Sequence, residues 1–253
     1  MNSTLFSFLL TSIAGFSTLV GSILTFIKSK KTKAIIASSL AFASAVMITV
    51  SFTDLIPESI HMLKNIYPVF PSYIIMFLFI NVGIILSFLI DKYLPDQKLE
   101  GKKGNLYKVG IISMLAIILH NIPEGMATFM ASNTDKSLGI ALTIAIALHN
   151  IPEGISISIP IYYSTNSRKK ALLYTFISGL SELFGALITF LFLRPYINDR
   201  IMGILFAIIA GIMLHIAVYE LLPTSFQYKM KKISICFFII GIIFMMINHL
   251  LFL

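Results

Sequence analysis

Long apolar stretches, separated by short polar connections, follow one another along the whole sequence. Eight of them can be recognised, at about 5–27, 34–56, 72–94, 108–131, 138–160, 170–193, 201–222 and 233–253. Each has about the 20 residues that a helix needs to cross the hydrocarbon core of a bilayer. The pattern predicts an all-α polytopic membrane protein with eight transmembrane helices, in which residues 1–253 form a single transmembrane domain.

The composition agrees with this prediction. Only 12% of the residues are charged and the mean hydropathy is +0.92, whereas a soluble domain carries about 25% charged residues. The single cysteine, Cys236, excludes an internal disulfide and a metal cage built from thiolates. The sequence contains no P-loop, so nothing indicates ATP hydrolysis as the energy source.

The net charge of +8 could suggest a nucleic-acid partner, but the positions of the basic residues argue against one. Fifteen of the nineteen lie in alternate connections, those after the first, third, fifth and seventh helices. Basic connections stay in the cytoplasm. This distribution therefore predicts that both termini are extracellular or periplasmic. The fifteen residues are Lys28, Lys30, Lys31, Lys33, Lys92, Lys98, Lys102, Lys103, Lys108, Arg168, Lys169, Lys170, Lys229, Lys231 and Lys232.

Two internal repeats organise the chain. The hexapeptide His-Asn-Ile-Pro-Glu-Gly occurs at 120–125 and again at 149–154, in helices that run in opposite directions. A weaker match relates residues 54–59 to residues 220–225, and the same offset aligns the first three helices with the last three. We expect a 3+2+3 inverted repeat, as in secondary transporters with a site at the membrane midplane. Coincidence between apolar sequences remains the alternative for the weaker match.

The repeated hexapeptide carries the candidate chemistry. A histidine and a glutamate four residues apart lie on one face of a helix, and the asparagine flanks the glutamate. Ionisable groups at membrane depth are costly and rarely occur without a function, so we expect a divalent metal ion between the two helices. A hydrogen bond between the helices, without metal, is the alternative. The candidate ligands are His120, Asn121 and Glu124 in the first copy, and His149, Asn150 and Glu153 in the second.

A third carboxylate, Glu182, lies midway along the sixth helix at the expected depth of the motifs. We expect it to complete the site; otherwise it pairs with a basic or hydroxyl group. Imidazole with carboxylate and amide oxygens suits Zn²⁺, Fe²⁺, Mn²⁺, Co²⁺ or Cd²⁺, and the absence of thiolate ligands argues against Cu⁺.

Further polar residues mark the two ends of a possible path. Asp54, Glu58 and His61, at the outer end of the second helix, could attract a cation to an entrance. Solvated charge at a helix end is the alternative. At the inner ends of the third and seventh helices, an exit could be formed by Asp91, His215 and Glu220, unless Asp91 merely neutralises Lys92. His249, near the C-terminal end, is not expected to take part.

The paired motifs, with Ser-Glu-Leu-Phe-Gly-Ala at 181–186, resemble the ZIP (Zrt-, Irt-like) family of divalent metal transporters, and most closely its bacterial zinc-uptake type. The resemblance implies uptake into the cytoplasm, homodimers, and movement of helices 1, 4, 5 and 6 against helices 2, 3, 7 and 8. It also implies two metal ions. One would be bound by His120, Glu124, His149 and Glu153, and the other by Asn121, Glu124, Asn150, Glu153 and Glu182. Many members carry a histidine-rich loop after the third helix; the connection at about 95–107 has no histidine.

Three functions compete on these observations. The first is a secondary-type transporter for Zn²⁺ or a related divalent ion, which needs no cofactor beyond the transported metal and has the bilayer and a second copy as partners. The second is a membrane-embedded di-metal oxidase or hydroxylase, although bundle di-iron proteins use Glu-x-x-His and this chain has His-x-x-x-Glu. The third is a metal-gated channel. A mirrored repeat favours a carrier, and polar groups toward both membrane faces favour transport.

Overall fold

The computed structural model describes residues 3–26, 31–93, 101–193 and 196–252. Within these ranges the chain is helical, and eight helical spans are long and apolar enough to cross a membrane. The predicted fold class is therefore confirmed. The elements are α1 (Ser3–Gly21) with η1 (Ser22–Phe26); α2 (Thr32–Val50), η2 (Ser51–Leu55) and α3 (Ile56–Lys64); α4 (Val69–Tyr93); α5 (Gly101–Thr134); α6 (Lys136–Thr165); α7 (Arg168–Ile188) with η3 (Thr189–Leu193); α8 (Asp199–His215), η4 (Ile216–Leu221) and α9 (Leu222–Gln227); and α10 (Lys231–Phe252).

Most helices extend beyond the apolar stretches that predicted them. The second span continues to Lys64 instead of ending near residue 56, and α5 begins at Gly101 instead of near residue 108. Hydropathy marks only the part of a helix that fits the hydrocarbon core, and a helix can continue into the polar interface. The expected connection at about 95–107 is thus helical from residue 101, while its first residues, and the predicted ends at 27, 94 and 253, lie outside the described residues.

The two motif helices, α5 and α6, are joined through a single residue, Asp135. Its backbone N–H donates to the carbonyl of Ala131 at the end of α5. Its side chain accepts hydrogen bonds from the N–H groups of Ser137 (2.7 Å) and Leu138 (3.1 Å), which caps the start of α6. A connection this short makes α5 and α6 antiparallel neighbours and brings the two hexapeptides to similar depth.

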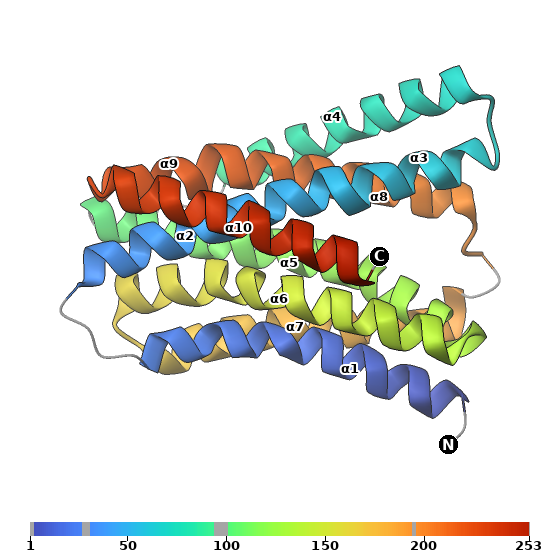
Figure 1. Cartoon of the computed structure of the whole chain (residues 1–253), viewed down its shortest axis with the longest axis horizontal. Coiled ribbons are helices and arrows are strands. Elements are labelled where there is room, and N and C mark those ends of the chain that lie inside the picture. The colour runs from blue at the N-terminus through green and yellow to red at the C-terminus, as the bar shows by residue number, and fades with distance from the viewer. Residues whose placement is uncertain (1–2, 27–30, 94–100, 194–195, 253) are drawn as a thin grey trace.

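The helices form two groups (Figure 1). One, the α1/α5/α6/α7 bundle, contains both hexapeptides and Glu182. The other, the α2/α4/α8/α10 bundle, includes α3 and α9 as the continuations of α2 and α8, and packs α10 on α2 and α4 on α8. The bundles meet where α2 and α10 lie against α6, and α8 against α5.

Helices within one bundle approach closely at glycines. A Cβ at Gly125 of α5 would collide with the carbonyl of Glu182 on α7, and one at Gly211 of α8 would collide with the carbonyl of Ile80 on α4. Among the described glycines, every such approach joins helices of the same bundle. Small residues allow membrane helices to pack backbone against backbone in this way.

The contact between the bundles is built differently. Its main part is a continuous apolar cluster of branched and flexible side chains, including Met47 of α2, Ile112 of α5, Ile155 of α6 and Met213 of α8. Each bundle is therefore held together by backbone proximity, whereas the boundary between them is an interface of side chains.

The weaker repeat has a matching local structure. Segments η2 and η4 are both π turns, each followed by a helix whose second residue is a proline, Pro57 or Pro223. Proline lacks an N–H and its ring excludes the carbonyl four residues earlier, and a π turn accommodates both effects. These two turns correspond in the offset that aligns 54–59 with 220–225, which favours a true repeat over coincidence.

Candidate metal site

The two hexapeptides face each other in the middle of the α1/α5/α6/α7 bundle. Helices α5 and α6 continue through Pro123 and Pro152, so each motif presents one helical face to the other. The rings of His120 and His149 have centroids 6.2 Å apart. Both histidines are buried.

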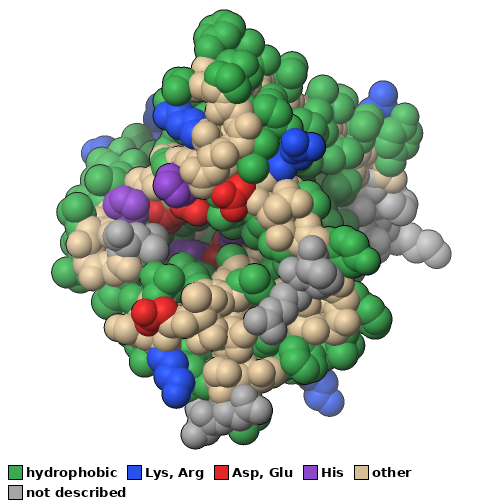
Figure 2. All heavy atoms as spheres, turned by 90° about the vertical axis from the view of Figure 1, so that its right-hand side faces the viewer, with side chains coloured by type: hydrophobic (Ala, Val, Ile, Leu, Met, Phe, Trp, Pro, Cys, Tyr) green, Lys and Arg blue, Asp and Glu red, His purple; other side chains and the backbone are tan. Residues whose placement is uncertain are grey.

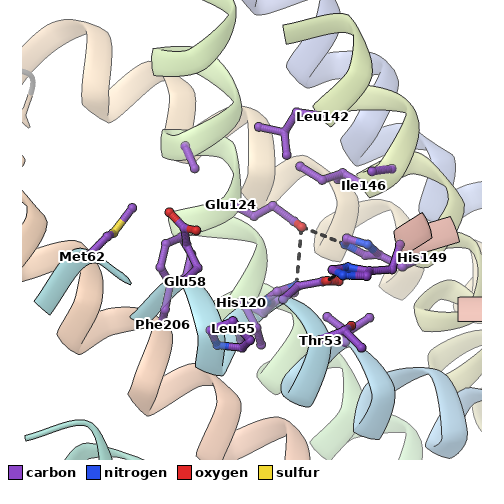
Figure 3. Close-up of a pocket in the computed structure, with 16 residues that line it drawn as sticks. Thr53, Leu55, Glu58, Met62, His120, Glu124, Leu142, Ile146, His149 and Phe206 are labelled. Atoms are coloured by element: carbon purple, nitrogen blue, oxygen red, sulfur yellow. Dashed lines mark hydrogen bonds and ion pairs between the residues drawn. The ribbon is translucent and has the colours of Figure 1, made fainter. Parts of the chain in front are cut away.

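Glu124 lies between the two imidazoles (Figure 3). Its Oε1 is 2.7 Å from His149 Nε2, and its Oε2 is 3.5 Å from His120 Nε2. Glu153 approaches the same ring from the other motif, with Oε1 3.6 Å from His120 Nε2. The ligand atoms of His120, Glu124 and His149 all lie within 4.8 Å of one another. Ligand atoms that each bind one ion at about 2 Å lie within roughly 4 Å of one another, so the spacing of these atoms is close to that of a metal site.

Two asparagines and Glu182 form a second layer of the site. Asn150 donates through Nδ2 to the carbonyl of Ala14 and to Glu182 Oε2, both at 3.0 Å. Asn121 donates through Nδ2 to the carbonyl of Ser178 at 3.1 Å. Because the amide nitrogens are used in these bonds, the carboxamide oxygens remain available as acceptors. The partner that the structure gives Glu182 is thus an amide, not a basic or hydroxyl group.

Every one of the seven predicted ligands has a buried polar atom without a hydrogen-bond partner among the described residues. A buried polar group left in this state costs about 1–3 kcal/mol. A cation would satisfy the acceptors among these atoms together; one nitrogen of each neutral imidazole carries a proton and is a donor. The seven residues, named here the deep cluster, and their unpartnered atoms are His120 Nδ1 and Nε2, Asn121 Oδ1, Glu124 Oε2, His149 Nδ1, Asn150 Oδ1, Glu153 Oε1 and Oε2, and Glu182 Oε1.

A cavity of about 400 Å³ reaches the deep cluster from one end of the molecule. Its mouth is lined by Asp54, Glu58 and His249, and its far end by His120, Glu124 and His149. Figure 2 shows a hollow in this end of the molecule, with acidic and histidine side chains around it and within it. The arrangement can admit a small cation to a buried set of nitrogen and oxygen ligands.

Comparisons with known proteins agree with the geometry. The model of the family described as "ZIP Zinc transporter" matches residues 96–249. The chain belongs to the ZIP family. Proteins named "Zinc transporter ZupT" are similar over nearly the whole chain. The one from Clostridium perfringens is 39% identical, with 100% of this chain and 98% of the relative covered. Those from Streptococcus mutans and Campylobacter jejuni are each 38% identical, covering 100% and 95% of this chain and 100% and 94% of the relatives.

Family membership confirms the resemblance drawn from the two motifs. ZIP proteins are membrane transporters, so the chain is a multi-pass membrane transporter and not an enzyme. The alternative of a di-metal oxidase or hydroxylase is therefore wrong.

At the mouth of the cavity in this ZIP protein, the structure brings together two of the three predicted entrance residues and one that was not predicted. Asp54 and Glu58 line the cavity, whereas His61 is exposed on α3 and is not among the lining residues. His249, for which no role was expected, lies 2.7 Å from Asp54 through Nδ1. In the sequence, only the position of His249 near the end of the last helix, at the expected level of Asp54, indicated that it could lie at the mouth.

At the opposite end of the helices, the predicted exit residues belong to a group that we name the distal cluster: Ser87, Asp91, Lys108, His215 and Glu220. Asp91 pairs with Lys108 of α5 at 2.8 Å, so the base that it neutralises in the structure is Lys108 and not Lys92, as the alternative had it. His215 is hydrogen-bonded through Nδ1 to Ser87 Oγ at 2.9 Å. Glu220 is close enough to Asp91 and Lys108 to interact with both charges.

Proposed function

We propose that this ZIP protein carries a divalent transition-metal ion, with Zn²⁺ as the first candidate, across the cytoplasmic membrane into the cytoplasm. The observation that carries the proposal is the deep cluster. It gathers two imidazoles, three carboxylates and two carboxamides inside the membrane-spanning bundle, each with an unpartnered buried atom. The names of the relatives, which are zinc transporters, favour zinc as the cargo.

The two layers of the deep cluster support a site for two ions. His120, Glu124, His149 and Glu153 would hold the first. The second would take Asn121, Asn150 and Glu182, with Glu124 and Glu153 shared between both ions. Shared carboxylates offset the repulsion between two cations, because each oxygen pair neutralises charge on both sides.

We further propose that transport proceeds by alternating access. The cavity reaches the deep cluster from the end that holds Asp54 and Glu58, where the cation would enter. Asp91, His215 and Glu220 lie toward the other end, where it would leave. The excess of basic residues in alternate connections supports a cytoplasmic position for that exit and an outside position for both termini. As the resemblance implies, the working unit would be a homodimer.

The test is uptake of ⁶⁵Zn²⁺ by purified protein in proteoliposomes, with unlabelled Zn²⁺, Fe²⁺, Mn²⁺, Co²⁺ or Cd²⁺ as competitors and with or without a pH gradient. A carrier should show uptake that saturates with Zn²⁺ concentration, and competitors that bind the deep cluster should reduce it. Uptake no faster than in empty liposomes would contradict the proposal. A flux that rises in proportion to concentration, without saturation, would favour the channel alternative.

A further inference from the structure

The end of α10 brings a histidine to the mouth of the cavity. His249 Nδ1 lies 2.7 Å from Asp54 Oδ1 of η2, across 195 residues of sequence. Both residues line the cavity that leads to His120, Glu124 and His149. The second oxygen of Asp54, Oδ2, is buried and has no hydrogen-bond partner among the described residues.

The neighbouring residue holds this end of the helix in place. Asn248 is buried, and its Nδ2 donates to the carbonyl of Ala145 on α6 at 3.1 Å. Ala145 lies one turn before His149 and also lines the cavity. The anchor on α6 fixes the last turn of α10, so the approach of His249 to Asp54 is a packed feature of the fold.

The contact determines which ring nitrogen of His249 can bind a cation. A carboxylate oxygen can only accept a hydrogen bond, so Nδ1 carries the proton and donates to Asp54. The lone pair then resides on Nε2. Histidines that bind metals in proteins almost always donate their other ring N–H to a carboxylate, a backbone carbonyl or water, which orients the ring and makes it a better ligand.

A second ligand is available at the mouth. Glu58 follows Asp54 by four residues, on the same face of the helix, and it lines the same cavity (Figure 3). Among the described residues, only His120, Glu124 and His149 form a group with ligand atoms within 4.8 Å of one another. The residues at the mouth do not form such a close group, and this open arrangement suits a cation that keeps some of its water and exchanges readily.

We propose that His249 Nε2 and the carboxylate of Glu58 form a capture site for a divalent transition-metal ion at the mouth of the cavity, with Asp54 as the residue that positions the imidazole. The site gathers cations next to the cavity and supplies them to the deep cluster. In this role it rests on the proposed uptake function, but its binding of metal does not.

Binding is measured first, in full-length protein whose deep cluster is disabled by Glu124→Ala and Glu153→Ala. Equilibrium titration with Zn²⁺ should find residual weak binding. Adding His249→Ala should abolish this binding, and Glu58→Gln should weaken it. Asp54→Asn should lower the affinity roughly 10–100-fold, as loss of an outer-shell partner does, and Asp54→Glu should recover part of it.

The matched control is His61→Ala, which removes an exposed histidine of α3 outside the cavity and should leave the residual binding unchanged. Absence of residual binding, or residual binding that survives both His249→Ala and Asp54→Asn, would overturn the proposal. Two substitutions at the same contact keep the test decisive if one variant does not fold.

Transport is measured next, with the deep cluster intact. His249→Ala should raise the KM for ⁶⁵Zn²⁺ uptake and leave the maximal rate unchanged, because capture matters only when cations are scarce. An unchanged KM would contradict the supply of cations from the mouth. If the native protein transports no metal while the mouth still binds Zn²⁺, the proposed function fails and the capture site stands. If transport is normal and the mouth binds nothing, the capture site fails alone.

Discussion

The deep cluster and the distal cluster contain similar residues in opposite states of pairing. Both contain histidines and carboxylates on membrane-spanning helices. In the deep cluster each residue has a buried atom without a hydrogen-bond partner among the described residues, although His149 also contacts Glu124. In the distal cluster Asp91 pairs with Lys108 and His215 with Ser87. The two clusters thus differ in kind: the deep cluster leaves acceptors that a bound cation would satisfy, whereas the pairs of the distal cluster join helices.

Replacing Glu124 should have the largest effect, because its two oxygens face both histidines of the deep cluster. Loss of outer-shell partners of a metal typically lowers affinity roughly 10–100-fold, so loss of this central ligand should cost at least as much. We expect Glu124→Ala to reduce ⁶⁵Zn²⁺ uptake in proteoliposomes to the level of empty liposomes. Normal uptake by a well-expressed variant would show that the cargo binds elsewhere.

Acid should also act on the deep cluster. Imidazole nitrogens and carboxylates bind a metal only when deprotonated, so protons compete with the cation. We expect uptake to fall as the external pH is lowered from about 7 to about 5, and to recover when the pH is restored. Equal initial rates at both pH values, measured with liposomes of matched internal pH, would contradict this.

The stability of the metal-free protein should distinguish open from paired groups. Both carboxylate oxygens of Glu153 lack hydrogen-bond partners among the described residues, and burying a carboxylate without hydrogen bonds is costly. We expect Glu153→Gln to keep or raise the melting temperature of the metal-free protein. Zn²⁺ at 100 times its Kd should stabilise the native protein by about 2.7 kcal/mol and the variant by much less. A marked loss of metal-free stability would mean that Glu153 is satisfied.

A paired group of the distal cluster should respond in the opposite way. His215 is hydrogen-bonded to Ser87, and its ring stacks on that of Tyr219 with the ring centroids 5.1 Å apart. We expect His215→Ala to lower the stability by about 1–3 kcal/mol, with the affinity for Zn²⁺ unchanged. Ser87→Ala is the matched variant. Because the two residues share one hydrogen bond, the double variant should lose less than the sum of the single variants. A large loss of Zn²⁺ affinity would assign His215 to the cargo site.

The smallest effect should come from the partly exposed pair of Asp91 and Lys108, with side chains 24% and 27% accessible. Exposed ion pairs contribute about 0–1 kcal/mol, so Asp91→Asn should change the melting temperature little. If Asp91 lines the exit, the variant should release Zn²⁺ more slowly while binding it normally. The double variant Asp91→Lys with Lys108→Asp exchanges the two charges and tests whether the ion pair itself is needed. If it recovers uptake that a single variant has lost, the pair acts by holding α4 and α5 together, and Asp91 is not a ligand on the exit path.

The sequence allowed the eight spans and the whole deep cluster to be predicted, for physical reasons. Apolar length is a local property, and the repeated hexapeptide lies on two helices joined through Asp135, so symmetry brings its six polar residues together. Glu182 lies outside the repeat, and only its depth along the sixth helix indicated its place. The contacts of His249 with Asp54 and of Asp91 with Lys108 depend on how separate helices pack, which no local pattern encodes. Helix ends were missed because hydropathy does not register the polar turns that continue into the interface.

The placement of the glycines has a mechanical consequence. Where two backbones touch, as at Gly125 and Gly211, no side chain can rearrange to absorb a displacement. Where the bundles meet, rotamers of residues such as Met47 and Ile155 can change. Sliding one bundle past the other would therefore leave every glycine junction among the described residues intact. It would consume soft apolar contacts and break a few polar ones, such as the hydrogen bond from Asn248 to Ala145 and the pair of Asp91 with Lys108.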